Sequence, residues 1–482
     1  MNLPLVLSKR HRRIRSIKDC EPGLPYTEII SNEGQRINLC KSLEYTQDSS
    51  RITSLPINND VIHSKLLRMF PELVKIYSKH IINLPTKFIL NENEVSKVEE
   101  IRVDSLIIGG GTSALGALSE LSGKERVLMI TAEVLGNLRN ENMPLPQTNR
   151  EDFIKILNSI IKDNKDKIIE GILLGKFDEG IAFRTNGRIL IVNSNRVFLA
   201  TGGRYIPPIF SGNDTPGVIS KNLYFRLREK INRIEVVGNS DDAVRVLLSV
   251  NDSKKILINN GILFLSKYYR ELIESIGIEI LKTKTLRVHR TSDGLQIFTD
   301  EKQFYSDALV YAVIKQPKVD HAYNIGLSYS FDKYLHIYMP NHSIEGKANE
   351  NVYIIGGMRG ISDEYTSFLS GKASVNSKYL DEFIDNMKTY NYIFNYYDNS
   401  FIVNSSPYLY GDSGYVCECE DVTYDQVNRK IKDGFNSVEE IKRVTGLGTG
   451  ECQGKICTYI VGSITKSENL ITFRSPLYRL VI

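Results

Sequence analysis

The 482-residue sequence contains no long hydrophobic run. Its opening MNLPLVL is a short apolar stretch interrupted by a proline, and basic residues follow that stretch instead of preceding it. This is the pattern of neither a signal peptide nor a membrane span. No later run approaches the length that crosses a bilayer. We therefore expect a cytoplasmic protein without a transmembrane segment, with peripheral attachment to a membrane left open.

The sequence also lacks a strong excess of either charge. Its 61 Lys and Arg against 57 Asp and Glu give a formal net charge of +4, which does not favour nucleic acid or an acidic surface as a partner. Six basic residues gather near the N-terminus, and we expect them to form a solvated arm, with contact to a phosphate or a partner as the alternative. They are Lys9, Arg10, Arg12, Arg13, Arg15 and Lys18.

Cysteine and histidine are scarce, and their positions argue against several enzyme classes. No C-x-x-C or C-x4-C pair accompanies the first glycine-rich helix, so a disulfide reductase is not expected. The seven histidines are scattered, and no residue stands out as a catalytic base. Cys20 and Cys40 are expected to be free buried thiols. The other four cysteines lie between Cys417 and Cys457, a clustering that favours metal over disulfides in an intracellular protein.

A glycine-rich turn marks the first domain. In VDSLIIGGGTSALGALSEL an apolar strand runs into glycines and then into a helix, which is the context of a dinucleotide-binding fold. Gly109, Gly111 and Ala114 fit G-x-G-x-x-G/A, in which the glycines allow a tight turn and the approach of a pyrophosphate to the helix N-terminus. A vestigial fold with an empty site is the alternative. The predicted contacts here are Gly109, Gly110, Gly111, Thr112 and Ala114.

Other nucleotide contacts are expected at the ends of later strands. The second strand ends at Thr131, and Glu133 follows near the position of a ribose-binding carboxylate. Two further loops, LATGG and YIIGG, add Thr201, Gly202, Gly356 and Gly357 to the predicted contacts. A second strand-turn-helix unit, RIEVVGNSDDAVRVLL, has a poorer motif and no ribose-binding residue after its next strand, so we expect it to retain the fold with weak or absent nicotinamide binding.

Four cysteines near the C-terminus predict a metal centre. Cys417-x-Cys419 and Cys452-x4-Cys457 offer four thiolates, as a [2Fe–2S] cluster requires, whereas a C-x-C pair is cramped for tetrahedral zinc. Zinc and free thiols remain alternatives. The segment between them predicts two helices with capping boxes and a third helix beginning near Gln453. Nearby glycines and cations suit a negatively charged cluster. These are Gly448, Gly450, Gly454, Lys442, Arg443 and Lys455.

These patterns predict an α/β protein with two Rossmann-like domains and a small helical C-terminal [2Fe–2S] domain. The N-terminal 100 residues show little periodicity beyond a helix expected around residues 65–81, and they are a candidate docking region. The expected boundaries are 101–230 with 335–390 for the nucleotide-binding domain, 231–334 for the degenerate second domain, 391–413 for a linker, with a docking segment as the alternative, and 414–482 for the iron–sulfur domain.

The residues then resemble a known family. CECEDVTYDQVNRKIKDGFNSVEEIKRVTGLGTGECQGKIC is similar to the bacterioferritin-associated-ferredoxin-like (BFD-like) [2Fe–2S] domain of the α subunits of dye-linked L-proline dehydrogenases, opine oxidases and hydrogen cyanide synthase. LATGGRYIPPIFSGNDTPGV and FRSPLYRL resemble segments of the same subunits, and KSLEYTQDSSRI is similar to the N-terminal region of sarcosine oxidase α subunits. Length and layout are closest to the archaeal proline dehydrogenase α subunit.

The resemblance implies a flavin disulfide-reductase-like fold, with the second Rossmann unit inserted into the first, and a hetero-oligomer. A β subunit would bind FAD and oxidise the amine, and electrons would pass, often through an FMN at the interface, to the cluster and an unknown acceptor. The α-subunit nucleotide is FAD, NAD or another adenine nucleotide in such proteins. Here Gly356-Gly357 replaces the usual Gly-Asp, and Ile314 stands where the family has glycine, which disfavours FAD in this chain.

The function favoured by these patterns is therefore electron transfer in an amine dehydrogenase. L-proline is the favoured substrate, and opines, glycine and sarcosine are the alternatives. One alternative is a self-contained NADH-dependent flavin and iron–sulfur reductase. Another is a scaffold in which nucleotide and cluster are structural.

Overall fold

The structure is a computed structural model that describes residues 5–7, 14–25, 27–30, 36–38, 40, 97–250, 255–394, 396 and 405–478. The helix expected around residues 65–81 and the segment similar to sarcosine oxidase subunits lie outside the described residues. Within the described ranges, none of the helices combines the length and the apolar character needed to cross a membrane.

The first Rossmann domain is built on a six-stranded sheet in the order β22-β9-β5-β6-β7-β8. The strands from β22 to β7 run parallel, whereas β8 is antiparallel to β7 and also pairs with β9. The carboxyl half of β5 and all of β6 are buried, as expected for parallel strands covered on both faces. The strands are β5 (Lys97–Ile108), β6 (Val127–Thr131), β7 (Ile168–Phe177), β8 (Gly180–Thr185), β9 (Arg188–Leu199) and β22 (Val352–Ile354).

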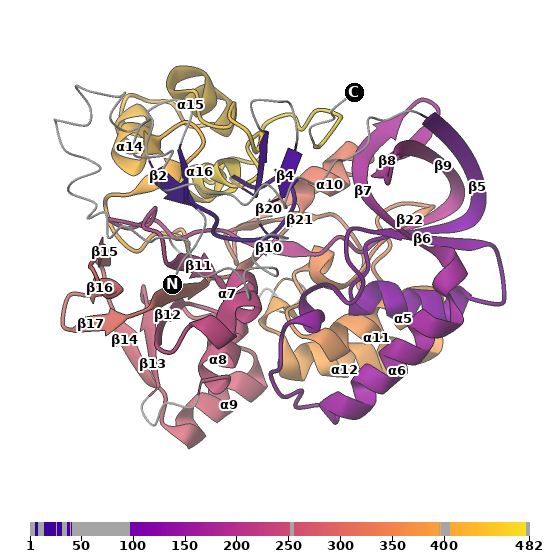
Figure 1. Ribbon diagram of the computed structural model, residues 1–482, viewed down its shortest axis with the longest axis horizontal. Helices are drawn as coiled ribbons and strands as arrows, with labels where there is room; N and C mark the ends of the chain where they lie inside the picture. The colour runs from indigo at the N-terminus through magenta and orange to yellow at the C-terminus, as the bar shows by residue number, and fades with distance from the viewer. Residues whose placement is uncertain are drawn as a thin grey trace.

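Four helices gather beside this sheet (Figure 1). They are α5 (Thr112–Leu121), α6 (Arg150–Asp163), α11 (Glu364–Val375) and α12 (Leu380–Tyr390). Glycines bring α5 and α11 unusually close: a Cβ on Gly116 would lie 2.2 Å from the Phe368 carbonyl oxygen, and one on Gly371 would lie 1.9 Å from the Ser113 carbonyl oxygen. This close packing fixes α5, and with it the glycine turn that precedes it.

The second domain is inserted between β9 and β22. The chain leaves through β10 (Gly203–Tyr205) and returns through β19 (Lys315–Pro317), and these two connections pair antiparallel. Between them lies a five-stranded parallel sheet in the order β11-β18-β12-β13-β14. Its strands are β11 (Val218–Ser220), β12 (Ile234–Gly238), β13 (Ile256–Asn259), β14 (Glu279–Lys282) and β18 (Ala308–Ala312). The predicted fold class, with one Rossmann unit inserted in the other, is confirmed.

The remaining elements of the inserted region cover or extend its sheet (Figure 1). Helices α7 (Lys221–Leu227), α8 (Asp241–Leu248) and α9 (Lys267–Ile276) follow strands β11, β12 and β13. A three-stranded meander comprises β15 (Arg287–Arg290), β16 (Leu295–Phe298) and β17 (Gln303–Ser306). After the chain has returned through β19, and so outside the inserted domain, come α10 (Val319–Asn324) and the hairpin β20 (Tyr329–Asp332) with β21 (Ile337–Pro340).

The C-terminal domain has a short hairpin and three helices. The hairpin pairs β23 (Tyr415–Cys417) with β24 (Val422–Thr423), and the helices are α14 (Tyr424–Lys432), α15 (Val438–Thr445) and α16 (Cys457–Thr465). Both predicted capping boxes are present, at Thr423 with Gln426 and at Ser437 with Glu440. The third helix begins at Cys457 and not near Gln453, which corrects the prediction. Gln453 has φ of +51° and Gly454 has φ of +79°, so the backbone there cannot be helical.

An N-terminal segment, residues 14–25, runs between the Rossmann domains and the C-terminal domain, and we call it the strap. Its Arg15 and Lys18 are buried, so at these positions the predicted solvated arm is wrong. Arg15 pairs with Asp214 and, at 2.5 Å, with Asp421, while Lys18 pairs with Glu418. These acidic partners lie about 200 and 400 positions away, so sequence pattern gave no sign of them.

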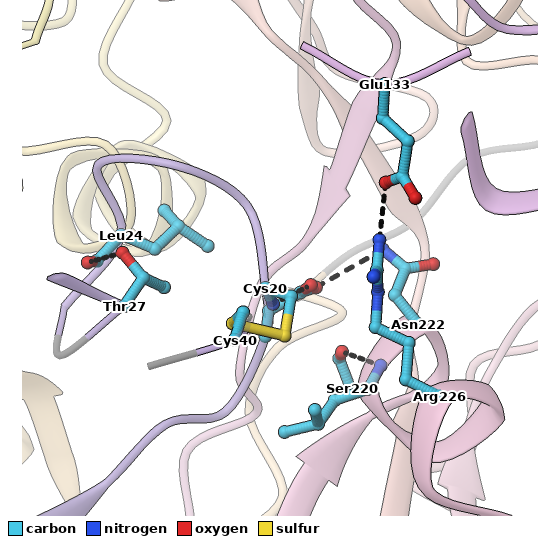
Figure 2. The surroundings of a disulfide bond; sticks show 10 residues. Cys20, Leu24, Thr27, Cys40, Glu133, Ser220, Asn222 and Arg226 are labelled. Carbon is cyan, nitrogen blue, oxygen red and sulfur yellow. Dashed lines mark hydrogen bonds and ion pairs between the residues drawn. A yellow bond between two sulfur atoms is a disulfide. The ribbon is translucent and has the colours of Figure 1, made fainter. Parts of the chain in front are cut away.

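The strap also carries a disulfide. Cys20 and Cys40 are joined, which corrects the prediction of two free thiols (Figure 2). Their separation of 20 positions is compatible with either state, and only the course of the chain brings the two side chains together.

Candidate cofactor sites

The glycine turn after β5 forms an anion cradle at the N-terminus of α5. Gly109 has φ of +120°, and a Cβ there would lie 2.3 Å from the Ala200 carbonyl oxygen, so only glycine fits. Around the Cβ position of Gly111 there is no atom within 4 Å, which leaves the approach to the helix open. No side chain caps α5, and its first turn has no acidic residue. Its first amide groups are therefore available to a phosphate.

This cradle opens into a cavity of about 260 Å³. The cavity brings together most of the predicted nucleotide contacts. Those on its wall are Gly109, Gly110, Gly111, Thr112, Thr131, Glu133, Thr201, Gly202 and Gly357. Ala114 and Gly356 are not on the wall: Ala114 is fully buried, and a Cβ on Gly356 would meet the Ser113 hydroxyl at 2.2 Å. They serve the packing behind the cradle.

Glu133 stands at the end of β6 where a ribose would bind. The Thr131 hydroxyl accepts a hydrogen bond from the Glu133 amide at 3.1 Å and donates to the Glu133 carbonyl at 2.8 Å, which fixes the turn. The Glu133 carboxylate pairs with Arg226 at 2.5 Å and with Arg139 at 3.4 Å. This end of the cavity therefore combines the Glu133 carboxylate with the Arg226 guanidinium, while Arg139 pairs with Glu133 without lining the cavity.

The opposite part of the cavity is bordered by a buried ion network between the two Rossmann domains. Lys221 pairs with Asp242 at 2.5 Å and with Glu141 at 3.2 Å. Arg245 pairs with Asp242 at 3.3 Å and also with Glu364. Glu141, Lys221 and Glu364 line the cavity. Because all five side chains are buried, each charge depends on its partners.

Burial and neighbouring charges separate the two glutamates of this network. Burial raises the pKa of Glu141 to about 7, and the adjacent Glu364 carboxylate adds to that effect. Burial acts in the same direction on Glu364, but the Arg245 guanidinium, the hydrogen bond with Glu141 and the nearby cations together outweigh it and lower the pKa of Glu364. The pKa of Glu141 therefore lies near neutral pH, whereas that of Glu364 lies below its ordinary value.

The N-terminus of α11 also faces this cavity but is not free for an anion. Asp363 is its N-cap and accepts from the Thr366 amide, and Glu364 follows in the first turn. Two carboxyl groups therefore already occupy the positive end of α11. Only the α5 end of the cavity has the character of a phosphate site.

The nucleotide position of the second Rossmann unit is closed by the chain itself. The Asn239 side chain donates to the Pro407 carbonyl at 2.9 Å and accepts from the Ile314 amide at 2.7 Å. Tyr408, one residue further on, is fully buried. The first turn of α8 carries Asp241 and Asp242, which would repel a phosphate. These residues do not fit a dinucleotide.

The four C-terminal cysteines converge on one cavity of about 40 Å³. Cys417 ends β23, Cys419 follows in the loop, Cys452 lies in the turns before α16, and Cys457 opens that helix. All four are at most 9% exposed. The thiols form hydrogen-bonded pairs, Cys419 with Cys452 and Cys417 with Cys457. Two pairs of thiols match the two irons of a [2Fe–2S] cluster, each of which takes two.

Backbone donors and one cation surround Cys452. The hydrogen bond with Cys419 lowers the pKa of Cys452 to about 6, and the Lys455 ammonium and the Gly454 amide act in the same direction. Lys455 is 3% exposed, and its Nζ donates to the carbonyls of Cys452 at 3.1 Å and Leu477 at 2.7 Å. A Cβ on Gly450 would lie 2.3 Å from the Cys419 Cβ, so glycine allows the two cysteine loops to meet. These surroundings favour negative charge on the Cys452 sulfur, whereas the hydrogen bond to the neighbouring thiol and burial raise the pKa of Cys419 and of Cys457.

Lys442 and Arg443, also expected near the sulfurs, instead pair with Glu439 on the surface of α15, at 3.3 and 3.2 Å. Of the three basic residues predicted to surround the site, Lys455 is the one whose charge acts on a cysteine of the site.

The two cavities are separated by little more than the strap. Asp19 lines both. Tyr205 lines the cysteine cavity, and its hydroxyl donates to Asp242 at 2.7 Å and lies 3.5 Å from the Lys221 ammonium, which borders the nucleotide cavity. Groups held in the two cavities would therefore be neighbours.

A second connection runs through Arg204, which is fully buried. It pairs with Asp320 at 2.9 Å and with Glu21 at 2.6 Å, and it donates to the Lys455 carbonyl at 3.0 Å. His321 lines the nucleotide cavity next to this group, and burial lowers its pKa to about 3. The turn between Cys452 and Cys457 is thus fixed, through the Lys455 carbonyl, to the wall of the nucleotide cavity.

Several of these residues could not be found from sequence. The strap lies about 90 positions before the glycine turn in a region without periodicity, and no motif marked Arg226, Lys221 or Arg204. A weak signal existed for Lys455 alone, because it lies between the last two cysteines in CQGKIC.

Comparisons with known proteins agree with this architecture. Residues 415–464 match the family of BFD-like [2Fe–2S] binding domains. The C-terminal domain is a BFD-like iron–sulfur domain. No curated protein matches the chain.

Among solved structures, L-proline dehydrogenase from P. horikoshii is 20% identical, with 80% of each chain covered and a TM-score of 0.59, which shows a shared fold. Thioredoxin reductase from T. acidophilum is 13% identical over 58% of this chain and 99% of its own, with a TM-score of 0.43. The HOCl-induced flavoprotein disulfide reductase RclA from Escherichia coli is 20% identical over 56% of this chain and 69% of its own, with a TM-score of 0.42.

Proposed function

We propose that this chain is the electron-transferring α-type subunit of a heteromeric flavin-dependent amine dehydrogenase acting on L-proline. The observation that carries the proposal is the cavity of four buried cysteines next to the nucleotide cavity, with Asp19 on the wall of both. Cys417, Cys419, Cys452 and Cys457 would hold the [2Fe–2S] cluster, which supplies one-electron transfer. The fold shared with L-proline dehydrogenase from P. horikoshii supports the choice of substrate.

The chain's own residues prepare both sites for negatively charged groups. The amides at the start of α5 would bind the pyrophosphate of an adenine nucleotide, and Glu133 would orient its ribose. Lys455 and the Gly454 amide stabilise charge on the cluster side. FAD is disfavoured, because Gly357 offers no carboxylate for a ribityl chain and α11 is already capped by Asp363. An FMN at a partner interface would lie outside this chain's own cavities.

Substrate oxidation would belong to an FAD-containing β subunit. The closed nucleotide position of the second Rossmann unit supports this division, since a self-contained NADH-dependent reductase would need that position open. We therefore expect electrons to enter this chain from a partner flavin and not from NADH.

The test is purification of the tagged chain from its native host without oxygen, followed by L-proline-dependent dye reduction. Activity together with a co-purifying flavoprotein is the expected result. A partner without proline activity would move the substrate to an opine, glycine or sarcosine. Proline oxidation by the pure single chain, or dye reduction with NADH, would refute the proposal.

A further inference from the structure

The strap forms part of the wall of the nucleotide cavity. Asp19, Cys20, Glu21 and Pro22 line this cavity, while Ser16, Lys18, Asp19, Leu24 and Pro25 line the cysteine cavity on the other side. A displacement of these few residues would therefore open the nucleotide cavity toward the C-terminal domain.

The charged contacts of the strap reach both neighbouring domains, because Arg15 pairs with Asp214 of the inserted domain and with Asp421 of the C-terminal domain. On one side of Cys20, Lys18 pairs with Glu418 of the C-terminal domain. On the other side, Glu21 pairs with Arg204 at 2.6 Å and Lys318 at 3.4 Å, which lie where the chain enters and leaves the inserted domain. These ion pairs fix both flanks of Cys20, so the segment that reduction would free is short and centred on Cys20.

The disulfide attaches the same wall to the core of the second domain. Cys40 is 8% exposed and packs in the hydrophobic core that includes Ile219 and Leu223. Ile17 of the strap is fully buried in the same core, and polar contacts also join the strap to α7 and the strand before it. The Ser220 amide donates to the Lys18 carbonyl at 2.8 Å, and the Asn222 amide group donates to Asp19 at 3.3 Å.

Asp19 is a poor anchor, because burial and the nearby Glu21 raise its pKa. Figure 2 shows the disulfide together with Asn222 and the Arg226–Glu133 ion pair at the ribose end of the cavity.

We propose that Cys20–Cys40 is a thiol–disulfide exchange site that latches the strap over the nucleotide cavity and is opened by dithiols. Cys20 is partly exposed on the cavity wall, where a small dithiol can reach it. One thiolate of the dithiol attacks a cysteine sulfur and forms a mixed disulfide, releasing the other cysteine as a thiolate. The second dithiol sulfur then displaces the first cysteine. Two electrons pass from the dithiol to the protein disulfide, and both cysteines end as protonated thiols.

Reduction should therefore speed the exchange of bound nucleotide. A cross-link that closes a loop of about 20 residues lowers the population of the open state by roughly two orders of magnitude. We expect the dissociation rate of the nucleotide to rise on the order of tenfold to a hundredfold after reduction. This inference rests on the proposed nucleotide site, and the experiment separates the two.

The experiment uses the full-length chain loaded with radiolabelled ADP and chased with unlabelled ADP, before and after treatment with dithiothreitol. The Cys20→Ser/Cys40→Ser double variant is the matched control, and visible absorption checks that iron is retained. Reduction should accelerate ADP release from the wild type, whereas the double variant should release ADP fast and be insensitive to dithiothreitol. An unchanged rate in the wild type, or a variant that still responds, would overturn the latch.

Hydrogen exchange gives a second readout that needs no nucleotide. The amides of residues 19–21 should exchange faster after reduction, and unchanged exchange would also overturn the proposal. If ADP, NAD and FAD all fail to bind the oxidised chain while exchange at the strap still responds to dithiothreitol, the nucleotide assignment fails and the latch stands.

Discussion

Replacing Lys455 with methionine should lower the reduction potential of the iron–sulfur cluster. The Lys455 ammonium is buried beside Cys452 and would stabilise the extra electron of the reduced cluster. At a separation of roughly 5 Å and an effective dielectric constant of about 20, Coulomb's law gives ~3 kcal/mol. For a one-electron couple this corresponds to a decrease of about 140 mV, and structural relaxation would reduce the effect.

The assay is a redox titration of the anaerobically purified chain followed by electron paramagnetic resonance. Lys442→Met is the matched control, because Lys442 pairs with Glu439 at the surface and its field is screened by water. Methionine also removes two hydrogen bonds of Lys455, worth about 1 kcal/mol each, so iron content must be measured for both variants. A potential that is unchanged in Lys455→Met, or that shifts equally in Lys442→Met, would refute the electrostatic role of Lys455.

Three further predictions concern the two sites and the ion network. Cys417→Ser should abolish stoichiometric iron and sulfide while Cys20→Ser keeps both, which chemical analysis would show; equal iron loss would contradict the assignment. Gly111→Ala should weaken ADP binding at least tenfold in titration calorimetry with little change in stability, because the added Cβ would fill the open cradle. Gly109→Ala should instead destabilise the fold by about 2 kcal/mol or more, because Gly109 has a positive φ. Equal losses of stability in Gly111→Ala and Gly109→Ala would argue against these separate roles of the two glycines. The pKa of Glu141 is raised to about 7, so the folded state binds its proton more tightly than the unfolded state, and the stabilisation from that proton is complete below pH 4.5 and lost as pH rises to about 7. The Glu141→Gln variant should therefore become more stable than the wild type as the pH rises from 5 to 8, by on the order of 2–3 kcal/mol in urea unfolding. A difference in stability that does not depend on pH would contradict the raised pKa.

Local signals were enough to predict much of the fold. Gly109 and Gly111 lie in a continuous strand-turn-helix stretch, and the structure places both on the wall of one cavity. The capping boxes at Thr423 and Ser437 were predictable because capping depends on residues three positions apart. The convergence of the four cysteines followed from two short motifs on either side of two helices.

Contacts across long stretches of sequence were not predictable. The disulfide between Cys20 and Cys40 and the buried ion pairs of Arg15 depend on how the strap crosses three domains. The closure of the second nucleotide position depends on Pro407, about 170 positions after Asn239, in a segment that the sequence analysis took for a linker. No periodicity or motif reports such contacts, because each involves a single residue held in place by its surroundings.

The most direct test of electron transfer is to add L-proline to the anaerobically purified complex and record the electron paramagnetic resonance spectrum after rapid freezing. The account predicts that the signal of a reduced [2Fe–2S] cluster appears within turnover when the partner flavoprotein is present, and that the separated chain gives no signal with L-proline or NADH. A cluster that stays oxidised during turnover of the complex, or one that NADH reduces in the separated chain, would contradict the account.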